Sequence, residues 1–209
     1  MQPTRPSRRR GANRCRPGGF SLIEMMITLT IVLVLYAMYF GFGSRQNQLQ
    51  QKKKCSTNLQ KIFVATQIYA NDSAGKFPVV AGARTAEEAL TVLVPRYAAD
   101  TAIFVCPGSP DALLPPGEPL TKGRISYAYY MGRSASETTS VLLSDRQINP
   151  LAKTAGENIF STTGKAPGNN HHKYGGNLLF CDGTVESSPA RSAIALPLAT
   201  NLVLLNPKP

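Results

Sequence analysis

A nearly continuous apolar run close to the amino terminus constrains this chain more than any other feature. Leu22 to Phe42 is 21 residues long and contains a single charged residue, Glu24. At about 1.5 Å rise per residue, a helix of this length just crosses the roughly 30 Å hydrocarbon core of a bilayer. The run therefore predicts a membrane-spanning helix. A lone carboxylate within it predicts a functional group, because an unpaired charge in lipid is strongly unfavourable.

The net charge of +11 is concentrated in front of this run. Residues 1–19 contain six arginines and no acidic residue. The rest of the chain holds 17 basic and 12 acidic residues, so more than half of the excess lies in a short leader. This pattern is typical of a targeting segment held at the cytoplasmic face of a membrane. The remaining basic excess has no recognition motif beside it, so we do not expect nucleic-acid binding as the main function.

Other export signals fit the segment poorly. A secretory signal needs a small-x-small cleavage site after the apolar run, and none follows; a twin-arginine interpretation of Ser7-Arg8-Arg9-Arg10 fails for the same reason. A lipoprotein interpretation of Cys15 fails because no apolar stretch precedes it. An ordinary signal anchor remains as an alternative, and Glu24 inside the run counts against it.

Helical periodicity continues beyond the apolar run. After a break near Gly41–Ser44, residues 45–70 place apolar side chains at spacings of three and four. These residues are Leu59, Ile62, Phe63, Thr66, Tyr69 and Ala70. Asn71, Gly75 and Pro78 then favour an end to the helix. The pattern predicts one nearly continuous helix from Phe20 to Ala70, with its lower half in lipid and its upper half supporting a head.

The junction between leader and apolar run, Gly19-Phe20-Ser21-Leu22-Ile23-Glu24, resembles the type IV prepilin signature. The resemblance implies that a prepilin peptidase cuts between Gly19 and Phe20 and methylates the new amino group of Phe20. Glu24 then becomes the fifth residue of the mature chain. A carboxylate in lipid is tolerated when a cation meets it, so Glu24 is expected to pair with the amino group of a neighbouring subunit during assembly.

The remaining sequence predicts a small head of short elements. Thr85-Ala86-Glu87-Glu88 fits a capping box for a helix from Ala86 to Val94. The strand candidates are Ile125–Met131, Val141–Ser144, Asn177–Cys181 and Thr184–Glu186. Asp182-Gly183 is expected to form a type I′ turn between the last two. Residues 107–123 and 148–170 are expected to be loops. The apolar tail from Ile194 to Leu205 has no interpretation at this stage.

Together these elements predict an α+β fold: a long amino-terminal helix, transmembrane in its lower half, packed on a small antiparallel sheet. The predicted organisation is a removable basic leader at 1–19, a transmembrane half-helix at 20–43, an exported half-helix at 44–75, and a pilin-like head with a carboxy-terminal tail at 76–209.

The head resembles a large group of pseudopilin-like bacterial proteins at its carboxy-terminal end. His172 is followed after nine residues by Asp182-Gly183, which matches the His-x9-Asp-Gly element of that group. The residues themselves do not indicate a role for the element. The simplest interpretation is a hairpin turn at Asp182-Gly183 and a hydrogen-bonded histidine in the preceding loop, with no metal bound. A calcium site using Asn71-Asp72-Ser73 and Asp182 has little support, although some related secretion pseudopilins bind calcium in their heads.

Three cysteines remain once the leader is removed, so at most one intramolecular disulfide can form in an oxidising compartment. The pseudopilin-like group often has cysteines at the positions of Cys55 and Cys106 and alanine at that of Cys181. The resemblance therefore predicts a Cys55–Cys106 disulfide and a free Cys181, with a Cys106–Cys181 pair as the alternative. The run Lys52-Lys53-Lys54 is expected to form a solvated or headgroup-contacting helix face.

The predicted function is a structural subunit of a type IV pilus or a type II secretion-like pseudopilus, without enzymatic activity or cofactor. Its expected partners are a prepilin peptidase, other pilin-like subunits and an inner-membrane assembly platform. The expected location is the bacterial inner membrane, crossed once, with a cytoplasmic amino terminus and a periplasmic head, and afterwards the filament. The alternative is an anchored binding or hydrolytic head that uses the prepilin export route. A hydrolase built on Ser144, Asp145 and His172 would lack a recognisable nucleophile motif.

Overall fold

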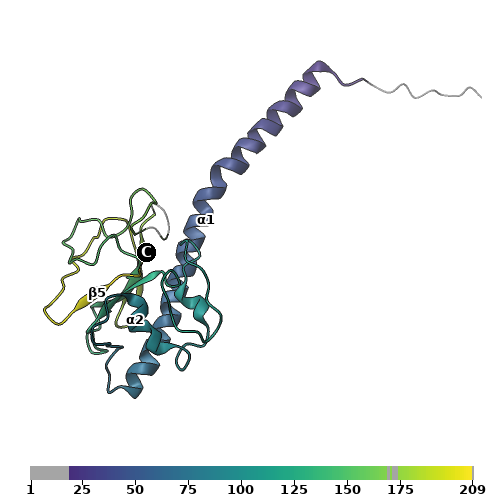
Figure 1. Ribbon diagram of the computed structural model, residues 1–209. Helices are drawn as coiled ribbons and strands as arrows, with labels where there is room; N and C mark the ends of the chain where they lie inside the picture. Colours follow the sequence, from purple (N-terminus) through teal and green to yellow (C-terminus); the bar gives the residue numbers. More distant parts are fainter. Residues whose placement is uncertain (1–18, 169, 171–173, 209) are drawn as a thin grey trace, which may run out of the picture. The chain divides into compact units, whose positions relative to one another are not determined.

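The long helix predicted at the amino terminus is present as a single element. The computed structural model describes residues 19–168, 170 and 174–208. Helix α1 extends over Leu22–Asp72, 51 residues, through the predicted break. The chain divides into two compact units at the Gly43–Ser44 boundary, so α1 contributes its first part to one unit and its second part to the other. Figure 1 shows α1 from its purple start to its teal end.

Helix α1 ends where the sequence signals predict. The N–H of Gly75 donates to the carbonyl of Ala70 at 2.8 Å, and the residue before it, Ala74, has φ 53°. A left-handed residue just after a helix, followed by a bond of this kind, is a common way to satisfy the last carbonyls of the helix. The turn after Asp72 therefore separates α1 from the rest of the head.

The second part of α1 buries the predicted apolar face. Leu59, Ile62, Thr66 and Ala70 are buried, while Phe63 and Tyr69 are partly buried against the same core. The Thr66 hydroxyl returns a hydrogen bond of 2.7 Å to the Ile62 carbonyl, so burying this residue leaves its donor satisfied. Each fully buried Leu or Ile stabilises the packing by about 1.5–3 kcal/mol relative to exposure.

The head contains one five-stranded antiparallel sheet with the strand order β4-β3-β2-β1-β5. The strands are β1 (Tyr127–Met131), β2 (Val141–Asp145), β3 (Gly176–Phe180), β4 (Val185–Ser188) and β5 (Val203–Leu205). The first four correspond to the predicted strands, and each pairs with the next along the chain. The predicted α+β architecture is confirmed.

Strand β5 was not predicted. It lies inside the apolar tail from Ile194 to Leu205 and returns to pair with β1, with Leu205 opposite Tyr129 and Val203 opposite Met131. It therefore forms one edge of the sheet, shown in yellow in Figure 1. The tail that had no sequence interpretation thus supplies the fifth strand.

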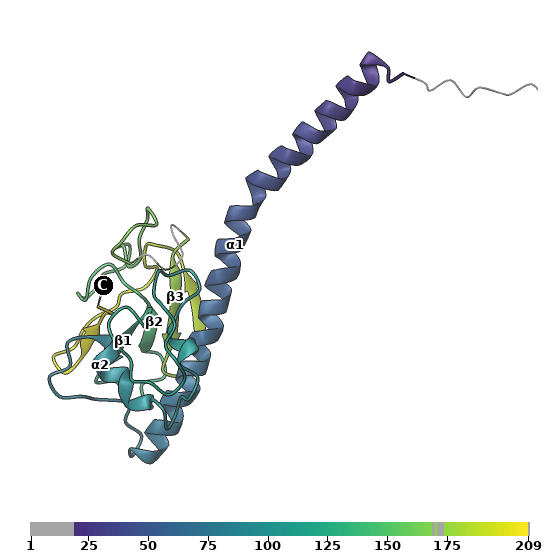
Figure 2. The ribbon, with the colours of Figure 1, turned by 45° about the vertical axis from the view of Figure 1, so that its right-hand side comes forward.

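Both faces of the sheet are covered. Side chains along β1 point alternately to the two faces of the sheet. Tyr127 and Tyr129 lie in the core shared with α1 and α2, and Ala128 and Tyr130 lie in a second core. The second core is covered by Ile159, Phe160 and Leu196, which come from segments outside the regular elements. Figure 2 shows α1 beside β3 on one side of the sheet. The described residues of the predicted loop at 148–170 therefore lie outside the regular elements but supply core side chains.

The short helix of the head differs from its prediction in two ways. Helix α2 (Ala86–Leu90) ends early and continues as a 3-10 turn, η1 (Thr91–Leu93). The predicted capping box is wrong, because the Thr85 side chain makes no cap bond and Glu88 Oε2 accepts from the N–H of Arg84 at 2.7 Å. The carboxylate therefore reaches one residue further back than the motif requires. A second 3-10 turn, η2 (Thr101–Phe104), precedes Cys106.

Candidate functional site

The segment that resembles the prepilin signature lies at the start of α1. Gly19 and Phe20 precede the helix and are exposed. The carbonyl of Ser21 accepts from the N–H groups of Glu24 and Met25 at 3.0 and 3.1 Å, which forms the first turn. A Cβ atom placed on Gly19 would meet nothing within 4 Å. Packing within the described chain therefore gives no reason for a glycine at this position.

The helix that follows has the properties of a membrane span. Leu22–Tyr39 is long and apolar enough to cross a bilayer, and none of it is buried within the protein. The hydroxyls of Thr28 and Thr30 donate to the carbonyls of Met25 and Met26 at 3.0 and 2.7 Å. These bonds satisfy donors that lipid cannot satisfy.

Glu24 is the acidic residue in the first turn of α1. Its side chain is exposed, and no salt bridge among the described residues involves it. The amino-terminal end of a helix favours a nearby carboxylate, but only by about 0.3–1 kcal/mol at exposed sites. A carboxylate in lipid mainly requires a cation, and the described residues from 19 to 39 include no lysine or arginine.

In the head, a buried amine links α1 to the β3–β4 hairpin. Lys52 Nζ donates to the carbonyls of Tyr174 and Ser188 at 2.8 and 3.0 Å. Burial lowers the pKa of Lys52, and the nearby carboxylate of Asp145 opposes that shift. The predicted solvated face is therefore wrong for Lys52, although Lys53 and Lys54 are exposed.

Asp145, at the end of β2, accepts hydrogen bonds from both neighbouring segments. Its Oδ2 accepts from the backbone N–H and the side-chain amide of Asn177 at 2.7 and 2.9 Å. Its Oδ1 accepts from Asn170 Nδ2 at 3.3 Å. The amide of Asn177 also donates to the backbone carbonyl of Lys52 at 3.0 Å, so β2, β3 and α1 share one network. Buried polar networks of this kind fix one arrangement of the elements they join.

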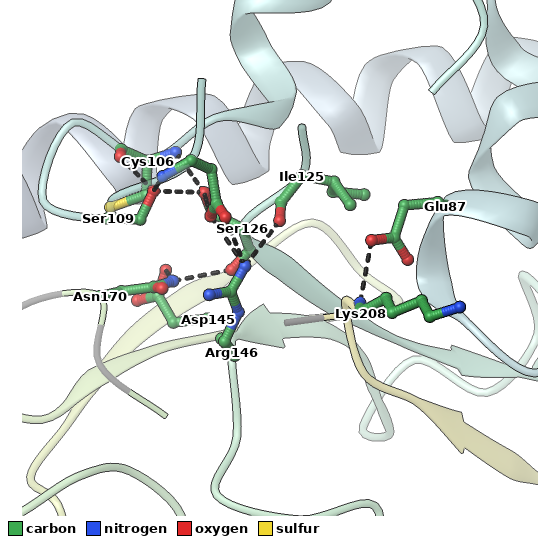
Figure 3. Close-up of polar contacts among 10 residues, drawn as sticks. Glu87, Cys106, Ser109, Ile125, Ser126, Asp145, Arg146, Asn170 and Lys208 are labelled. Carbon is green, nitrogen blue, oxygen red and sulfur yellow. Dashed lines mark hydrogen bonds and ion pairs between the residues drawn. The ribbon is translucent and has the colours of Figure 1, made fainter. Parts of the chain in front are cut away.

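A buried ion pair lies beside this network, as Figure 3 shows around Arg146 and Ser126. Arg146 Nη2 lies 2.8 Å from Asp111 Oδ1 and also donates to the carbonyl of Ile125 at 3.0 Å. Ser126 Oγ donates to Asp111 Oδ2 at 2.6 Å and accepts from the N–H of Cys106 at 2.9 Å. The pair thereby anchors the proline-rich loop to the sheet.

The cysteines pair as the resemblance implies. Cys55 and Cys106 form a disulfide with a Cα–Cα distance of 5.2 Å, and Cys181 is free and buried. Burial raises the pKa of the Cys181 thiol to about 12. The two disulfide sulfurs and a carboxylate oxygen of Asp145 lie within 4.8 Å of one another. Because the sulfurs are bonded to each other, they offer no thiolate to a metal.

Only part of the His-x9-Asp-Gly element can be placed, because His172 lies outside the described residues. The hairpin between β3 and β4 is present at Asp182-Gly183, but the predicted type I′ turn is wrong. That turn needs positive φ at both central residues, whereas only Gly183, with φ 89°, has it. The N–H of Gly183 donates to the carbonyl of Phe180 at 3.0 Å, so the turn begins at Phe180. Asp182 Oδ1 accepts from the N–H of Thr184 at 2.8 Å.

Gly183 also has a packing role that the sequence does not reveal. A Cβ atom there would lie 2.6 Å from the Phe63 ring of α1. The glycine therefore allows the hairpin turn to contact the long helix closely.

The remaining chemical candidates are already occupied by structural contacts. Ser144 is fully buried, its hydroxyl donates to the Asp145 carbonyl, and it accepts from Gln147 Nε2 at 2.9 Å. It is not an accessible nucleophile. The carboxylate of Asp72, considered for calcium, contacts Arg96 and Tyr97, each at 3.0 Å. Sequence reasoning missed Lys52, Asp111, Arg146 and Asn177, because no local pattern distinguishes these buried polar residues from exposed ones.

Comparison with known proteins matches the amino-terminal segment to a family. Residues 14–38 match the prokaryotic N-terminal methylation motif. The match includes Gly19, Phe20 and Glu24, and it supports a prepilin-type protein similar to type IV pilins or pseudopilins. No curated protein and no solved structure matches the chain. The similarity at the carboxy-terminal end stays a prediction.

Proposed function

We propose that this protein is a structural subunit of a type IV pilus or a type II secretion-like pseudopilus. In this proposal a prepilin peptidase cuts it between Gly19 and Phe20 and methylates the amino group of Phe20. The observation that carries the proposal is the methylation motif at residues 14–38, which overlaps an apolar helix that the protein leaves unburied.

The surroundings of the cleavage position support processing. Gly19 and Phe20 are exposed and lie outside α1, so a protease can reach the peptide bond that joins them. A glycine whose added Cβ would meet none of the described residues is consistent with a constraint imposed by an external binding partner. The peptidase supplies that constraint, since it must approach the backbone closely at the residue before the cut.

The environment of Glu24 supports assembly. The exposed carboxylate stands among exposed apolar residues on a helix expected to lie in lipid. The freed amino group of Phe20 in a neighbouring subunit is positive near neutral pH and stays positive after methylation. A small stagger between two helices brings these charges together, which offsets the unfavourable burial of each charge and favours a single register.

The proposed topology follows from the same features. The basic leader at 1–19 stays in the cytoplasm and is removed, residues 20–43 cross the inner membrane, and residues 44–75 and 76–209 are periplasmic. The subunit then joins other pilin-like subunits through an inner-membrane assembly platform. A disulfide between Cys55 and Cys106 is consistent with an exported head.

Replacement of Glu24 tests the assembly role. Glu24→Ala and Glu24→Gln should both insert into the membrane as well as the wild type, because removing a charge from lipid is favourable. Both should lose crosslinked multimers with pilin-like subunits in intact cells. Thr28→Ala is the matched control, since it removes a polar group from the same helix without changing charge, and it should assemble normally. Equal crosslinking in the wild type and both Glu24 variants would contradict the proposed pairing.

A further inference from the structure

A groove runs beside the edge strand β5, and none of its lining residues belongs to the amino-terminal helix segment that the proposed function uses. It has a volume of about 820 Å³. One wall is the segment that leads into α2, and the other includes Pro150 and the residues of β5 and the chain beyond it. Figure 1 shows β5 and α2 as neighbours. The whole groove therefore belongs to the head.

The outer side of β5 can be assigned from the hydrogen bonds of the sheet. The N–H of Arg146, just after β2, donates to the carbonyl of Ser126, just before β1, so this carbonyl points toward the β2 side of β1. The backbone N–H and C=O groups of successive residues point to opposite sides of a strand. Those of Tyr129 and Met131 therefore point toward β5. Their partners are Leu205 and Val203. The N–H and C=O of Leu204 must then point away from β1.

A second contact gives the same orientation independently. The carbonyl of Asn206, two residues beyond Leu204, accepts from the N–H of Ala86 at the start of α2. Backbone groups two residues apart in an extended chain point to the same side. The Leu204 side chain packs in the second core, so its backbone is the part that faces the groove. Within the described part of the chain, no hydrogen bond reaches the outward N–H or C=O of Leu204.

The charges around the groove are unbalanced. Arg84 and Lys208 line it and are exposed. Glu88 is the one acidic residue among those that line the groove, so the lining carries two positive charges and one negative charge. Its Oε2 accepts from the backbone N–H of Arg84 at 2.7 Å, which holds this carboxylate at the α2 side of the groove. A second copy of this edge would bring two net positive linings together. An acidic chain would instead meet a net positive lining beside an unpaired strand edge.

The end of the chain is held in place at this groove. The N–H of Lys208 donates to Glu87 Oε1 at 2.9 Å, as Figure 3 shows, and Asn206 Nδ2 donates to the carbonyl of Gln147 at 3.0 Å. The strand edge and its cationic neighbour are therefore preorganised for a ligand.

We propose that β5 is a docking edge for an extended acidic segment of another polypeptide, which adds to the sheet by pairing with the outward N–H and C=O of Leu204. Main-chain bonds of this kind provide affinity for an extended peptide, and the cations at Arg84 and Lys208 select acidic residues at its ends. Val203, half exposed on the same strand, offers an apolar contact to the added strand. This docking does not depend on whether the subunit polymerises.

The direct test uses the mature full-length chain in detergent micelles and three synthetic heptapeptides. The probe is Asp-Thr-Val-Thr-Val-Thr-Glu. A second peptide replaces its end residues by Asn and Gln, and a third carries an N-methyl group on the central backbone amide. The acidic probe should bind about fivefold more tightly than the neutral one at low salt, because two exposed ion pairs each contribute up to about 1 kcal/mol. The difference should shrink at high salt.

Site-resolved amide exchange locates the binding. At ten times its Kd, the acidic probe should slow exchange of the Leu204 N–H about tenfold, while the N-methylated peptide should leave it unchanged. Leu204→Pro removes the outward N–H and should abolish binding. Leu204→Ala loses the same side chain but keeps that N–H, and it should still bind. Arg84→Glu combined with Lys208→Glu should remove the preference for the acidic probe.

Three results would overturn the proposal. One is an unchanged Leu204 N–H at saturating acidic probe. Another is equal binding of the acidic and neutral peptides at low salt. The third is Leu204 protection that appears without peptide and rises with protein concentration, since that would make the occupant a second copy of the chain.

Discussion

Lys52 Nζ on α1 donates a hydrogen bond of 3.0 Å to the carbonyl oxygen of Ser188, the last residue of β4. The same amine binds the carbonyl of Tyr174 at 2.8 Å. Its neighbours Lys53 and Lys54 are exposed. One of three adjacent lysines therefore joins the long helix to the hairpin that follows it more than 120 residues later in the chain.

Lys52→Met should destabilise the head by about 1–3 kcal/mol, because it leaves two largely buried carbonyl groups without a donor. The measurement is urea unfolding of the mature chain, followed by circular dichroism. Lys53→Met is the matched control and should change the free energy of unfolding by less than about 0.5 kcal/mol. Equal effects of the two substitutions would contradict the assigned role of Lys52.

The pH dependence of the same pair of proteins follows from the lowered pKa of Lys52. The unfolded chain, with a lysine pKa near 10.5, holds this proton more tightly than the folded chain does. The contribution of Lys52 to the free energy of unfolding therefore increases as pH rises through the window between the lowered folded pKa and 10.5. The stability advantage of the wild type over Lys52→Met should grow across that window. A constant difference would count against burial of the ammonium group.

The buried pair of Arg146 and Asp111 should be sensitive to loss of either partner. Their side chains are 9% and 5% exposed. Asp111→Asn or Arg146→Met alone should lower the free energy of unfolding by about 3–5 kcal/mol, because the other partner is left buried and uncompensated. The double variant should lose clearly less than the sum of the two.

The exposed pair of Arg96 and Asp72 provides the comparison. Its side chains are 75% and 47% exposed at a similar separation of 3.0 Å. Arg96→Met should change the free energy of unfolding by about 0–1 kcal/mol. For the buried pair, additive effects of Asp111→Asn and Arg146→Met on the free energy of unfolding would show that the two residues are not coupled.

Gly183 should tolerate a side chain less well than a glycine with the same φ angle. Gly183 and Gly156 both have φ 89°, but only Gly183 has a neighbour where a Cβ would lie, the Phe63 ring at 2.6 Å. Gly156→Ala should destabilise by roughly 1–2 kcal/mol from backbone strain alone. Gly183→Ala should cost about 1–3 kcal/mol more through overpacking. Thermal unfolding of both variants measures the difference, and equal losses would remove the packing role of Gly183.

The disulfide should determine both thiol chemistry and stability. The mature chain should show one reactive thiol after non-reducing denaturation and three after reduction. Native Cys181 should react slowly, because it is buried and its pKa is raised to about 12. Cys55→Ser should lower the free energy of unfolding by about 2–4 kcal/mol, as expected for a closed loop with a sequence separation of 51 residues. Three reactive thiols without reduction would contradict the pairing.

Elements with strong local patterns could be predicted, and elements defined by distant partners could not. Helix α1 follows from an apolar run and an apolar face at spacings of three and four, both readable within a short window. Strand β5 has three residues and pairs with β1 about 70 residues earlier, so nothing local distinguishes Val203–Leu205 from an apolar loop. The turn after β3 was placed correctly but given the wrong type, because Asp182 keeps a negative φ while Gly183 does not.

The residues of the candidate site also divide into those that a local pattern reveals and those that only distant partners define. Gly19, Phe20 and Glu24 lie close together within the motif matched at residues 14–38, so sequence alone reveals them. The buried network of Lys52, Asp145 and Asn177 draws on three elements, and its burial depends on the rotation of α1 against the hairpin. No spacing rule connects these residues before the fold is known.

The central claim is that the chain is processed as a prepilin, and the mass of the membrane-extracted protein tests it most directly. The mature protein should begin at Phe20 with one methyl group on its amino nitrogen. Gly19→Val should accumulate with its leader intact, because the side chain blocks close approach of the peptidase. A wild-type protein that keeps residues 1–19, or that begins beyond the apolar run, would contradict the account.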